Sequence, residues 1–243
     1  MKILFVVAQF FYAEPIGTML LSGIAKRKGH DTSLAVLSVR PLMTDLEEYQ
    51  PDVVAYSVMS ADEHAFELAD QEVQKYSAQT KRRIVRIMGG PHPTYFPEVA
   101  KDKKWHLDAY CAGDGDQAFP TFLARVESVE GFSDIPNLMT RDQPERTKDI
   151  FTELDTLPFI DRSLFYDYDP NMLHVGLRSF VTGRGCPYKC TYCYNPSYNN
   201  MYVKGSGVKL MRRRSVDNLL DEIEHVIEKY SETVPIEVGG LSI

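Results

Sequence analysis

The sequence lacks any apolar run long enough to span a membrane, and it has no excess of positive charge. A membrane helix needs about 18 or more consecutive apolar residues, and no segment reaches that length. The apolar part of the first nine residues is too short for a signal peptide and lacks a small-residue cleavage pattern, so this segment is interpreted as a buried strand. With 34 acidic and 27 basic side chains, the net charge is −7, which argues against non-specific binding to nucleic acid or anionic membranes.

Cysteine is also scarce, and its distribution excludes a disulfide framework. Of the four cysteines, three lie within eight residues (Cys186, Cys190 and Cys193), and Cys111 stands alone. A secreted domain of this size would place cysteines in distant segments so that they can cross-link them. The clustering instead indicates reduced thiols used together on a metal, and therefore a cytoplasmic protein.

The first half of the chain has the pattern of an α/β fold. Short apolar runs rich in β-branched or aromatic residues alternate with helical periodicity, and they predict strands at 3–8, 34–39, 53–58, 84–88 and 107–112. Gly29 is expected to end the first helix, and Ser60 to Glu63 has the spacing of a capping box. Such a series predicts a doubly wound parallel sheet of the flavodoxin or Rossmann type.

Parallel sheets of this kind bind ligands beyond the carboxyl ends of their strands. Ser57, Gly89, Gly90 and Gly113 fall at those ends and are the candidate ligand contacts of this half. Turn chemistry alone could explain each glycine-rich loop, but two such loops on one sheet edge favour a ligand platform. No G-x-G-x-x-G follows the first strand, which argues against a dinucleotide.

The second half contains the sequence Gly-Cys-Pro-Tyr-Lys-Cys-Thr-Tyr-Cys-Tyr at 185–194, with cysteine spacing C-x3-C-x2-C. Thiolates held this close can converge on a soft metal centre, such as an iron–sulfur cluster. Three ligands would leave one iron of a four-iron cluster open. A zinc site is the alternative, but its fourth ligand would have to be Cys111 or a histidine such as His174. The missing fourth ligand favours the cluster.

This motif resembles the signature loop of radical S-adenosylmethionine enzymes. Residues 89–93 (Gly-Gly-Pro-His-Pro), residues 113–116 and the linker 157–162 are similar to segments of the cobalamin-binding branch of that family. The resemblance covers essentially the whole chain. It implies a cobalamin-binding α/β domain at 1–135, a linker at 136–175, and the start of a radical S-adenosylmethionine partial (β/α) barrel at 176–243.

The resemblance also implies cofactors and site residues. Cys186, Cys190 and Cys193 would bind a [4Fe–4S] cluster whose fourth iron chelates S-adenosylmethionine, and Tyr192 would lie against the adenine. Gly239 and Gly240 stand where the family has a Gly-Gly-Glu segment that binds this cofactor, although Leu241 replaces the glutamate. The cobalamin contacts would be those four residues at the carboxyl ends of the first sheet. Their side chains and backbone would position cofactors rather than perform the chemistry, so no catalytic residue is assigned.

The expected function follows from the same resemblance. The chain would cleave S-adenosylmethionine reductively to a 5′-deoxyadenosyl radical and use cobalamin for methyl transfer or related chemistry on an unactivated carbon of a small-molecule substrate. An electron donor such as flavodoxin or ferredoxin would be its partner. A corrinoid-binding module with a vestigial cluster loop and a zinc-stabilised interaction protein are the alternatives.

Besides Leu241, two features depart from a complete family pattern. Residues 9–17 contain no histidine, so a cobalt ligand from this loop is not expected. Only 176–243 corresponds to the barrel, where six βα units would need about 190 residues, so the chain is interpreted as a fragment of a longer enzyme or as a remnant. Residues 201–215 hold five basic residues and no acidic ones, which indicates either a solvated loop before a helix or an arginine that meets a carboxylate or phosphate of a cofactor. Residues 216–230 predict a helix capped by Ser215 with Leu219, Leu220, Ile223, Val226 and Ile227 inward.

Overall fold

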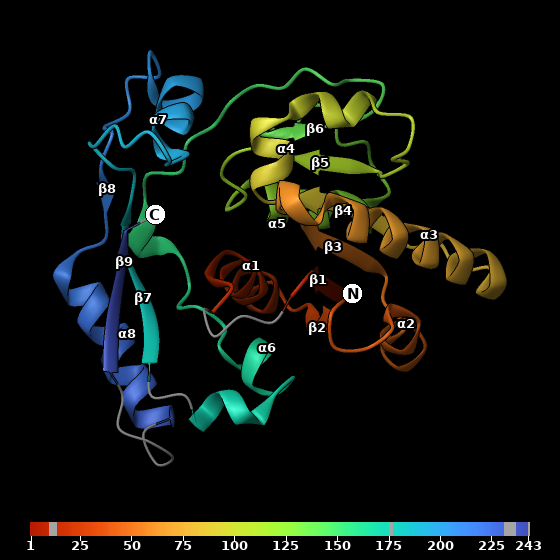
Figure 1. Ribbon diagram of the computed structural model, residues 1–243, viewed down its shortest axis with the longest axis horizontal. Helices are drawn as coiled ribbons and strands as arrows, with labels where there is room; N and C mark the ends of the chain where they lie inside the picture. Colours follow the sequence, from red (N-terminus) through yellow and green to blue (C-terminus); the bar gives the residue numbers. More distant parts are fainter. Residues whose placement is uncertain (10–13, 175–176, 231–236, 243) are drawn as a thin grey trace. The chain divides into compact units, whose positions relative to one another are not determined.

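The computed structural model describes residues 1–9, 14–174, 177–230 and 237–242 (Figure 1). The chain divides into two compact units. The first contains residues 1–11 and 21–149, and the second contains residues 12–20 and 150–243. In the described part of the chain, no helix combines the length and the apolar character needed to cross a membrane.

The first unit is built on a six-stranded sheet of order β2-β1-β3-β4-β5-β6, in which the first five strands are parallel and β6 is antiparallel to β5. The strands are β1 (Lys2–Val7), β2 (Asp31–Val36), β3 (Val53–Ser57), β4 (Val85–Gly89), β5 (Ala109–Cys111) and β6 (Leu138–Met139). This strand order is the flavodoxin-like one, which confirms the predicted α/β class.

Helices cover both faces of this sheet, as a parallel sheet requires. On one face, strand residues such as Leu4, Val54 and Met88 share a core with α2 (Leu42–Tyr49) and α3 (Glu63–Thr80). On the other face, the ring of Phe5 lies 5.6 Å from that of Phe119, centroid to centroid. The other helices that contribute to this unit are α1 (Ile16–Arg27), α4 (Pro91–Tyr95), α5 (Ala118–Ser128), and the 3-10 turns η1 (Ser60–Asp62) and η2 (Pro97–Lys101).

The two predicted helix boundaries of this unit have different outcomes. Gly29 has φ +85° and follows the end of α1, where the His30 N–H donates to the Ala25 carbonyl at 3.1 Å, so this C-cap is confirmed. The capping box at Ser60 is wrong. Ser60 begins η1, and α3 begins at Glu63 without a side-chain cap. The Ser60 Oγ instead lies 3.1 Å from His92 Nδ1.

The second unit contains a three-stranded sheet of order β8-β7-β9. Strand β7 (Leu177–Arg184) is parallel to β9 (Glu237–Ser242) and antiparallel to β8 (Arg212–Arg213), and α8 (Val216–Tyr230) lies between β8 and β9 in sequence. Strand β7, helix α8 and strand β9 therefore form a βαβ unit, with β8 as an addition. The remaining helical segments are η3 (Leu154–Thr156), α6 (Ser163–Tyr166), η4 (Pro170–His174), α7 (Asn195–Tyr198) and η5 (Asn199–Val203).

Helix α8 buries a different set of residues from the one that its apolar periodicity predicts. Ser215 caps it as predicted, since the Asn218 N–H donates to Ser215 Oγ at 3.2 Å, and Val226 is buried. However, Leu220 and Ile227 are exposed, and Glu222 is buried in their place. The reason is electrostatic: Glu222 pairs with Arg214, and this contact turns the charged position of the helix inward.

The compact units do not coincide with the predicted domain limits. Residues 136–149 were expected in the linker, but they belong to the first unit because β6 pairs with β5. Asn137 secures this segment: its Nδ2 donates to the Asp114 and Asp149 carbonyls at 2.9 and 2.7 Å. The functional limits 1–135, 136–175 and 176–243 stay a prediction.

We predict that Asp70→Ala lowers the free energy of unfolding of the protein by about 3–5 kcal/mol. Asp70 is 2% exposed, and its oxygens accept hydrogen bonds from Arg86 Nη1 at 2.9 Å and from the Tyr56 hydroxyl at 3.0 Å. Without the carboxylate, a half-buried guanidinium and a buried hydroxyl lose this acceptor. Urea denaturation checks this. Asp134→Ala, at a carboxylate that is 65% exposed, is the control and should cost less than about 1 kcal/mol. Equal losses in both variants would contradict the prediction.

Candidate functional site

The structure brings the predicted cobalamin contacts together at one edge of the first sheet. Ser57 ends β3 and is the register partner of Gly89, which ends β4. Gly90 follows β4, and Gly113 lies two residues after the end of β5, the next strand in the sheet. All four residues are half-buried, so this edge is open to a ligand. Whether a corrinoid touches them stays a prediction.

Gly90 has a structural reason to be glycine. Its φ is +94°, and a Cβ at this position would lie 2.9 Å from both the N and the O of Val58. The Val58 N–H donates to the Gly89 carbonyl at 2.9 Å, and the His92 N–H donates to the Val58 carbonyl at 2.9 Å. The backbones after β3 and β4 therefore pack directly on each other, and any side chain at position 90 would separate them.

Thr94 ties this loop to the one after β5. Its Oγ1 donates to the Gly90 carbonyl at 2.8 Å and accepts from the Gly113 N–H at 3.1 Å. The three loops at the carboxyl ends of β3, β4 and β5 thus form one hydrogen-bonded surface. Two exposed apolar side chains lie on connections at the same end of the sheet: Val39 follows β2, and Met59 follows β3. Such a surface suits a flat ligand with an apolar face.

His92 lies beneath this surface rather than on it. It is buried in α4, with Nδ1 3.1 Å from Ser60 Oγ and Nε2 3.4 Å from Glu63 Oε1. Burial lowers the pKa of this imidazole, and the Glu63 charge acts in the opposite direction. This position is that of a residue that supports the packing below the surface. Its ring joins α4 to the turn before α3.

The cysteine loop begins directly after β7, at a glycine that no other residue could replace. Gly185 has φ +90°, and a Cβ there would lie 1.9 Å from the carbonyl oxygen of Leu210. A small apolar cluster supports the segment after the loop; it consists of Ile150, Tyr202 and Val203, with Tyr198, Met201, Val208 and Leu210 packed against them. The start of the loop is therefore fixed by backbone packing.

The three thiols of this loop are free and accessible. Cys186 and Cys193 are half-buried, and Cys190 is exposed. The Cys193 N–H donates to the Cys190 carbonyl at 3.2 Å. Asn199 Nδ2 donates to the Cys186 carbonyl at 3.0 Å, and Asn195 Nδ2 lies 3.5 Å from the Cys193 sulfur. Sequence reasoning missed both asparagines, because neither belongs to the cysteine spacing.

The loop does not hold the thiols in a preformed metal site. Across the part of the chain that the structure describes, no three His, Cys, Asp or Glu side chains form a group that could hold a metal ion. The donor chemistry nevertheless fits an iron–sulfur cluster, since three free thiols share one short accessible loop. Tyr192, predicted to contact adenine, is 92% exposed. The ligand roles of these residues stay predictions.

Gly239 and Gly240 lie inside β9. They are the register partners of Ser179 and Phe180 on β7. Their backbone is therefore part of the sheet that carries the cysteine loop. Their contact with S-adenosylmethionine stays a prediction.

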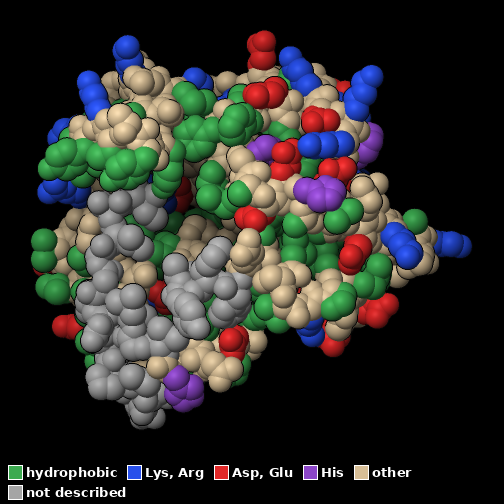
Figure 2. Space-filling model, viewed as in Figure 1, with side chains coloured by type: hydrophobic (Ala, Val, Ile, Leu, Met, Phe, Trp, Pro, Cys, Tyr) green, Lys and Arg blue, Asp and Glu red, His purple; other side chains and the backbone are tan. Residues whose placement is uncertain are grey.

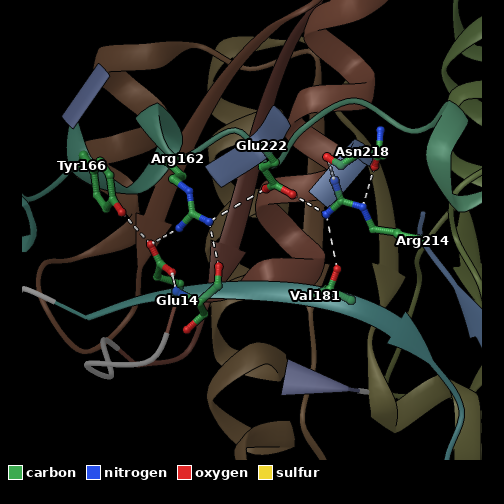
Figure 3. A network of polar contacts seen from close by, with 8 residues as sticks. Glu14, Arg162, Tyr166, Val181, Arg214, Asn218 and Glu222 are labelled. Atoms are coloured by element: carbon green, nitrogen blue, oxygen red, sulfur yellow. Dashed lines mark hydrogen bonds and ion pairs between the residues drawn. The ribbon is translucent and has the colours of Figure 1, made fainter. Parts of the chain in front are cut away.

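The second unit also contains a buried charge network that sequence reasoning missed (Figure 3). Glu14 Oε1 accepts hydrogen bonds from Arg162 Nη1 at 2.7 Å and from the Tyr166 hydroxyl at 2.6 Å. Burial would lower the pKa of Arg162, but the charge and hydrogen bond of Glu14 outweigh it and raise that pKa. Burial, together with Glu14, raises the pKa of Tyr166, so this hydroxyl stays a donor. No local pattern announces the pair, because its members are 148 residues apart.

The basic segment 201–215 divides between this network and the surface. Arg214 pairs with the carboxylate of Glu222 inside the protein. A contact between an arginine of this segment and a cofactor stays a prediction. Arg212 is buried and donates to the Phe151 carbonyl at 2.7 Å. Lys204, Lys209 and Arg213 are exposed, as expected for a solvated loop.

Comparison with known proteins gives one family match and several distant relatives. A model of the B12 binding domain family matches residues 2–123. The chain is 23% identical over 230 residues to an uncharacterized methyltransferase of Pyrococcus horikoshii, covering 89% of this chain and 46% of that protein. It is also 23% identical over 234 residues to the anaerobic magnesium-protoporphyrin IX monomethyl ester cyclase of Cereibacter sphaeroides, covering 89% and 36% respectively.

Among solved structures, the chain is similar to the cobalamin-dependent S-adenosylmethionine radical enzyme OxsB with aqua-cobalamin and S-adenosylmethionine bound. The TM-score is 0.76 at 16% identity, over 98% of this chain and 34% of OxsB. At this identity the likeness concerns the fold. The chain therefore spans less than half the length of each of these three proteins.

We predict that the four thiols differ sharply in reactivity towards iodoacetamide at pH 8. Burial, followed by the charges of Asp116 and Asp114, raises the pKa of Cys111 to about 12, so this thiol stays protonated. Cys190 is exposed and should be alkylated first, and Cys111 should react on the order of 100-fold more slowly. Peptide mass spectrometry over time measures all four rates in one sample. Labelling of Cys111 as fast as Cys190 would contradict the packing described for β5.

Proposed function

The chain belongs to the B12-binding domain family through residues 2–123, and on this premise we propose that it works as a cobalamin-dependent radical S-adenosylmethionine enzyme. The observation that carries the proposal is the combination, in one chain, of a flavodoxin-like unit of this family and a loop with three free cysteines at C-x3-C-x2-C spacing. The names of its relatives, a methyltransferase and a cyclase, support the same class.

In this proposal the cysteine loop holds a [4Fe–4S] cluster through Cys186, Cys190 and Cys193. Asn195 contributes an N–H directed at the Cys193 sulfur, and hydrogen bonds to cluster sulfurs tune the reduction potential. Tyr192 offers an exposed ring for the adenine of S-adenosylmethionine, and the backbone at Gly239 and Gly240 would bind its amino acid part. When bound, the cluster supplies the electron for reductive cleavage of S-adenosylmethionine, and cobalamin supplies methyl transfer.

The first unit provides the proposed cobalamin surface. Ser57, Gly89, Gly90 and Gly113 would contact the corrinoid with backbone and small side chains, which allow a macrocycle to approach closely. Met59 and Val39 add apolar contact area at the same end of the sheet. Residues 9–17 contain no histidine, so this connection supplies no imidazole to cobalt. The proposed reaction is methyl transfer, or related radical chemistry, on an unactivated carbon of a small molecule in the cytoplasm.

We predict that replacing any one of the three clustered cysteines by serine abolishes cluster assembly. The reason is that the three thiolates are the proposed protein ligands of the cluster. Anaerobic reconstitution of the wild-type chain with iron and sulfide should give a brown protein with about four iron atoms per chain. Cys111→Ser is the matched control, since that thiol is buried in the first unit, and it should load iron normally. Iron and sulfide analysis and EPR after dithionite reduction measure the result.

The same preparations distinguish the competing functions. With S-adenosylmethionine and dithionite, the loaded wild-type chain should form 5′-deoxyadenosine, and added hydroxocobalamin should co-elute with it on gel filtration. Corrinoid binding without iron or 5′-deoxyadenosine would instead indicate a binding module. Stoichiometric zinc with no iron uptake would indicate a zinc-stabilised protein.

We also propose an acidic one-electron donor protein, such as a flavodoxin or ferredoxin, as the partner of the cysteine loop. Between Pro170 and Val216 the sequence has eight Lys or Arg and no Asp or Glu, although the whole chain has a net charge of −7. Lys189, Lys204, Lys209 and Arg213 are exposed, and none of them forms an ion pair with a residue that the structure describes. In the region of α7, Figure 2 shows basic side chains bordering hydrophobic ones. Charge complementarity of this kind accelerates protein association.

We predict that the triple variant Lys204→Glu, Lys209→Glu, Arg213→Glu slows reduction of the loaded protein by flavodoxin hydroquinone at least about tenfold at low salt. The three new carboxylates repel an acidic partner, and the variant leaves all cysteines unchanged. Lys28→Glu with Lys103→Glu, at exposed lysines of the first unit, is the control and should leave the rate within about twofold. Stopped-flow absorbance measures both. Reduction by dithionite should be unchanged, and an equal effect of both variants on the flavodoxin rate would contradict a local docking surface.

A further inference from the structure

Strand β7 has one edge along whose first half no strand of the described residues pairs. On one side it pairs with β9 from Leu177 to Gly183. On the other side β8 reaches only Gly183 and Arg184. Residues two apart on a strand direct their backbone groups to the same edge, so Ser179 and Val181 turn theirs to this side. Unpaired backbone groups at a buried edge are costly, and an open edge invites wrong pairing.

Glu14 and Arg162 fill the place of a neighbouring strand at Ser179. The Ser179 N–H donates to Glu14 Oε2 at 2.7 Å, and Arg162 Nη2 donates to the Ser179 carbonyl at 2.7 Å. The two side chains are joined by the Arg162 Nη1 to Glu14 Oε1 contact at 2.7 Å. The side chain of Arg162 is 1% exposed and that of Glu14 is 3% exposed. One ion pair thus satisfies both backbone groups of a single residue.

A second ion pair continues along the same edge. Arg214 Nη1 donates to the Val181 carbonyl at 3.3 Å, and the Arg214 N–H donates to the Thr182 carbonyl at 3.1 Å. Glu222 contacts Arg214 with Oε2, and its Oε1 lies 3.9 Å from Arg162 Nη2. Figure 3 shows these side chains along one side of β7, with charges that alternate from Glu14 through Arg162 and Glu222 to Arg214.

We propose that this charged row acts as a side-chain substitute for a strand, and that Glu14 and Arg162 are positioning residues for the cysteine loop. Ser179 is seven residues before Cys186, and β7 leads from one to the other without interruption except Gly185. Hydrogen bonds that fix the backbone of Ser179 therefore also fix the position at which the loop begins. The proposal rests on the proposed function in one respect, which is that this loop is the cofactor loop.

The pair selects the register of β7 as well as covering its edge. A shift of one residue would turn the backbone groups of Arg178 or Phe180 to this side and those of Ser179 towards β9. Glu14 accepts hydrogen bonds from Arg162, Tyr166 and Ser179, and has no other partner in the described residues to replace them. Buried charges are tolerated only when they are well paired. A shifted β7 would leave the carboxylate of Glu14 buried without the Ser179 N–H as a donor. An apolar pair would cover the edge without this selectivity.

Hydrogen exchange on the metal-free full chain tests the proposal. In Glu14→Gln and in Arg162→Lys, the amides of Ser179 and its β7 neighbours should exchange on the order of 100-fold faster, because a buried partner is removed. The amides of β3 and β4 in the first unit should not change. Glu153→Gln, at an exposed carboxylate of the second unit, is the control and should match wild type. Tyr166→Phe removes only one hydrogen bond to Glu14 and should give an increase of several-fold.

A double variant separates positioning from plain stabilisation. Glu14→Leu with Arg162→Met removes both charges together, so the urea midpoint should return towards wild type. Protection of the Ser179 amide should stay lost, and alkylation of Cys186 should change at least threefold relative to Cys190 in the same sample. The rate at Cys111 reports whether the first unit is intact. Wild-type exchange at Ser179 together with a wild-type ratio of Cys186 to Cys190 alkylation would overturn the positioning role. These readouts need no cluster, so failed iron uptake would reject the proposed function and leave this inference to stand or fall on its own data.

Discussion

The need to pair every buried backbone N–H and C=O group is the constraint on which both candidate sites depend. In the first unit, backbone groups at the carboxyl ends of the strands are paired by the hydrogen bond from the Val58 N–H to the Gly89 carbonyl. Thr94 adds hydrogen bonds to Gly90 and Gly113. In the second unit, the side chains of Glu14 and Arg162 pair with the backbone groups at the edge of β7. Each solution leaves a small accessible surface beside a rigid backbone.

Glycine illustrates how far such packing explains the motifs. At Gly90 and Gly185 a Cβ would collide with neighbouring backbone, so the residue is required whether or not a ligand binds. The glycine-rich loops therefore did not identify a ligand by themselves. What identifies the first unit is its family match, together with a strand order that places those loops on one edge. The packing then explains why the loops can be so tight and still leave half-buried residues at the surface.

The predictable parts of this chain are those with a local signal. Runs such as residues 3–8 and 53–58 are apolar on both faces and could be assigned to a parallel sheet, and the cysteine spacing pointed to its family without any coordinates. Strand β6 is two residues long, too short for a period, and was placed in the linker. The buried face of α8 was misjudged because Glu222 is held inward by Arg214. Glu14 and Arg162 could not be found at all, since the sequence contains nothing that relates positions 148 residues apart.

The two ends of the cysteine loop are fixed by packing, whereas its thiols do not converge on one point. This arrangement affects the free energy of metal binding. Its start is fixed by Gly185 against Leu210, and Asn199 holds the Cys186 carbonyl from the far side of the loop. Between these anchors the thiols are accessible and form no ligand group among the described residues. Metal binding at such a place must supply the free energy of ordering the loop, and that cost grows with the number of residues to be ordered. Because the frame is already in place, only the short segment between the anchors needs to be ordered. The charged row along β7 lowers this cost further, since a strand that could slip would add its own disorder to that of the loop.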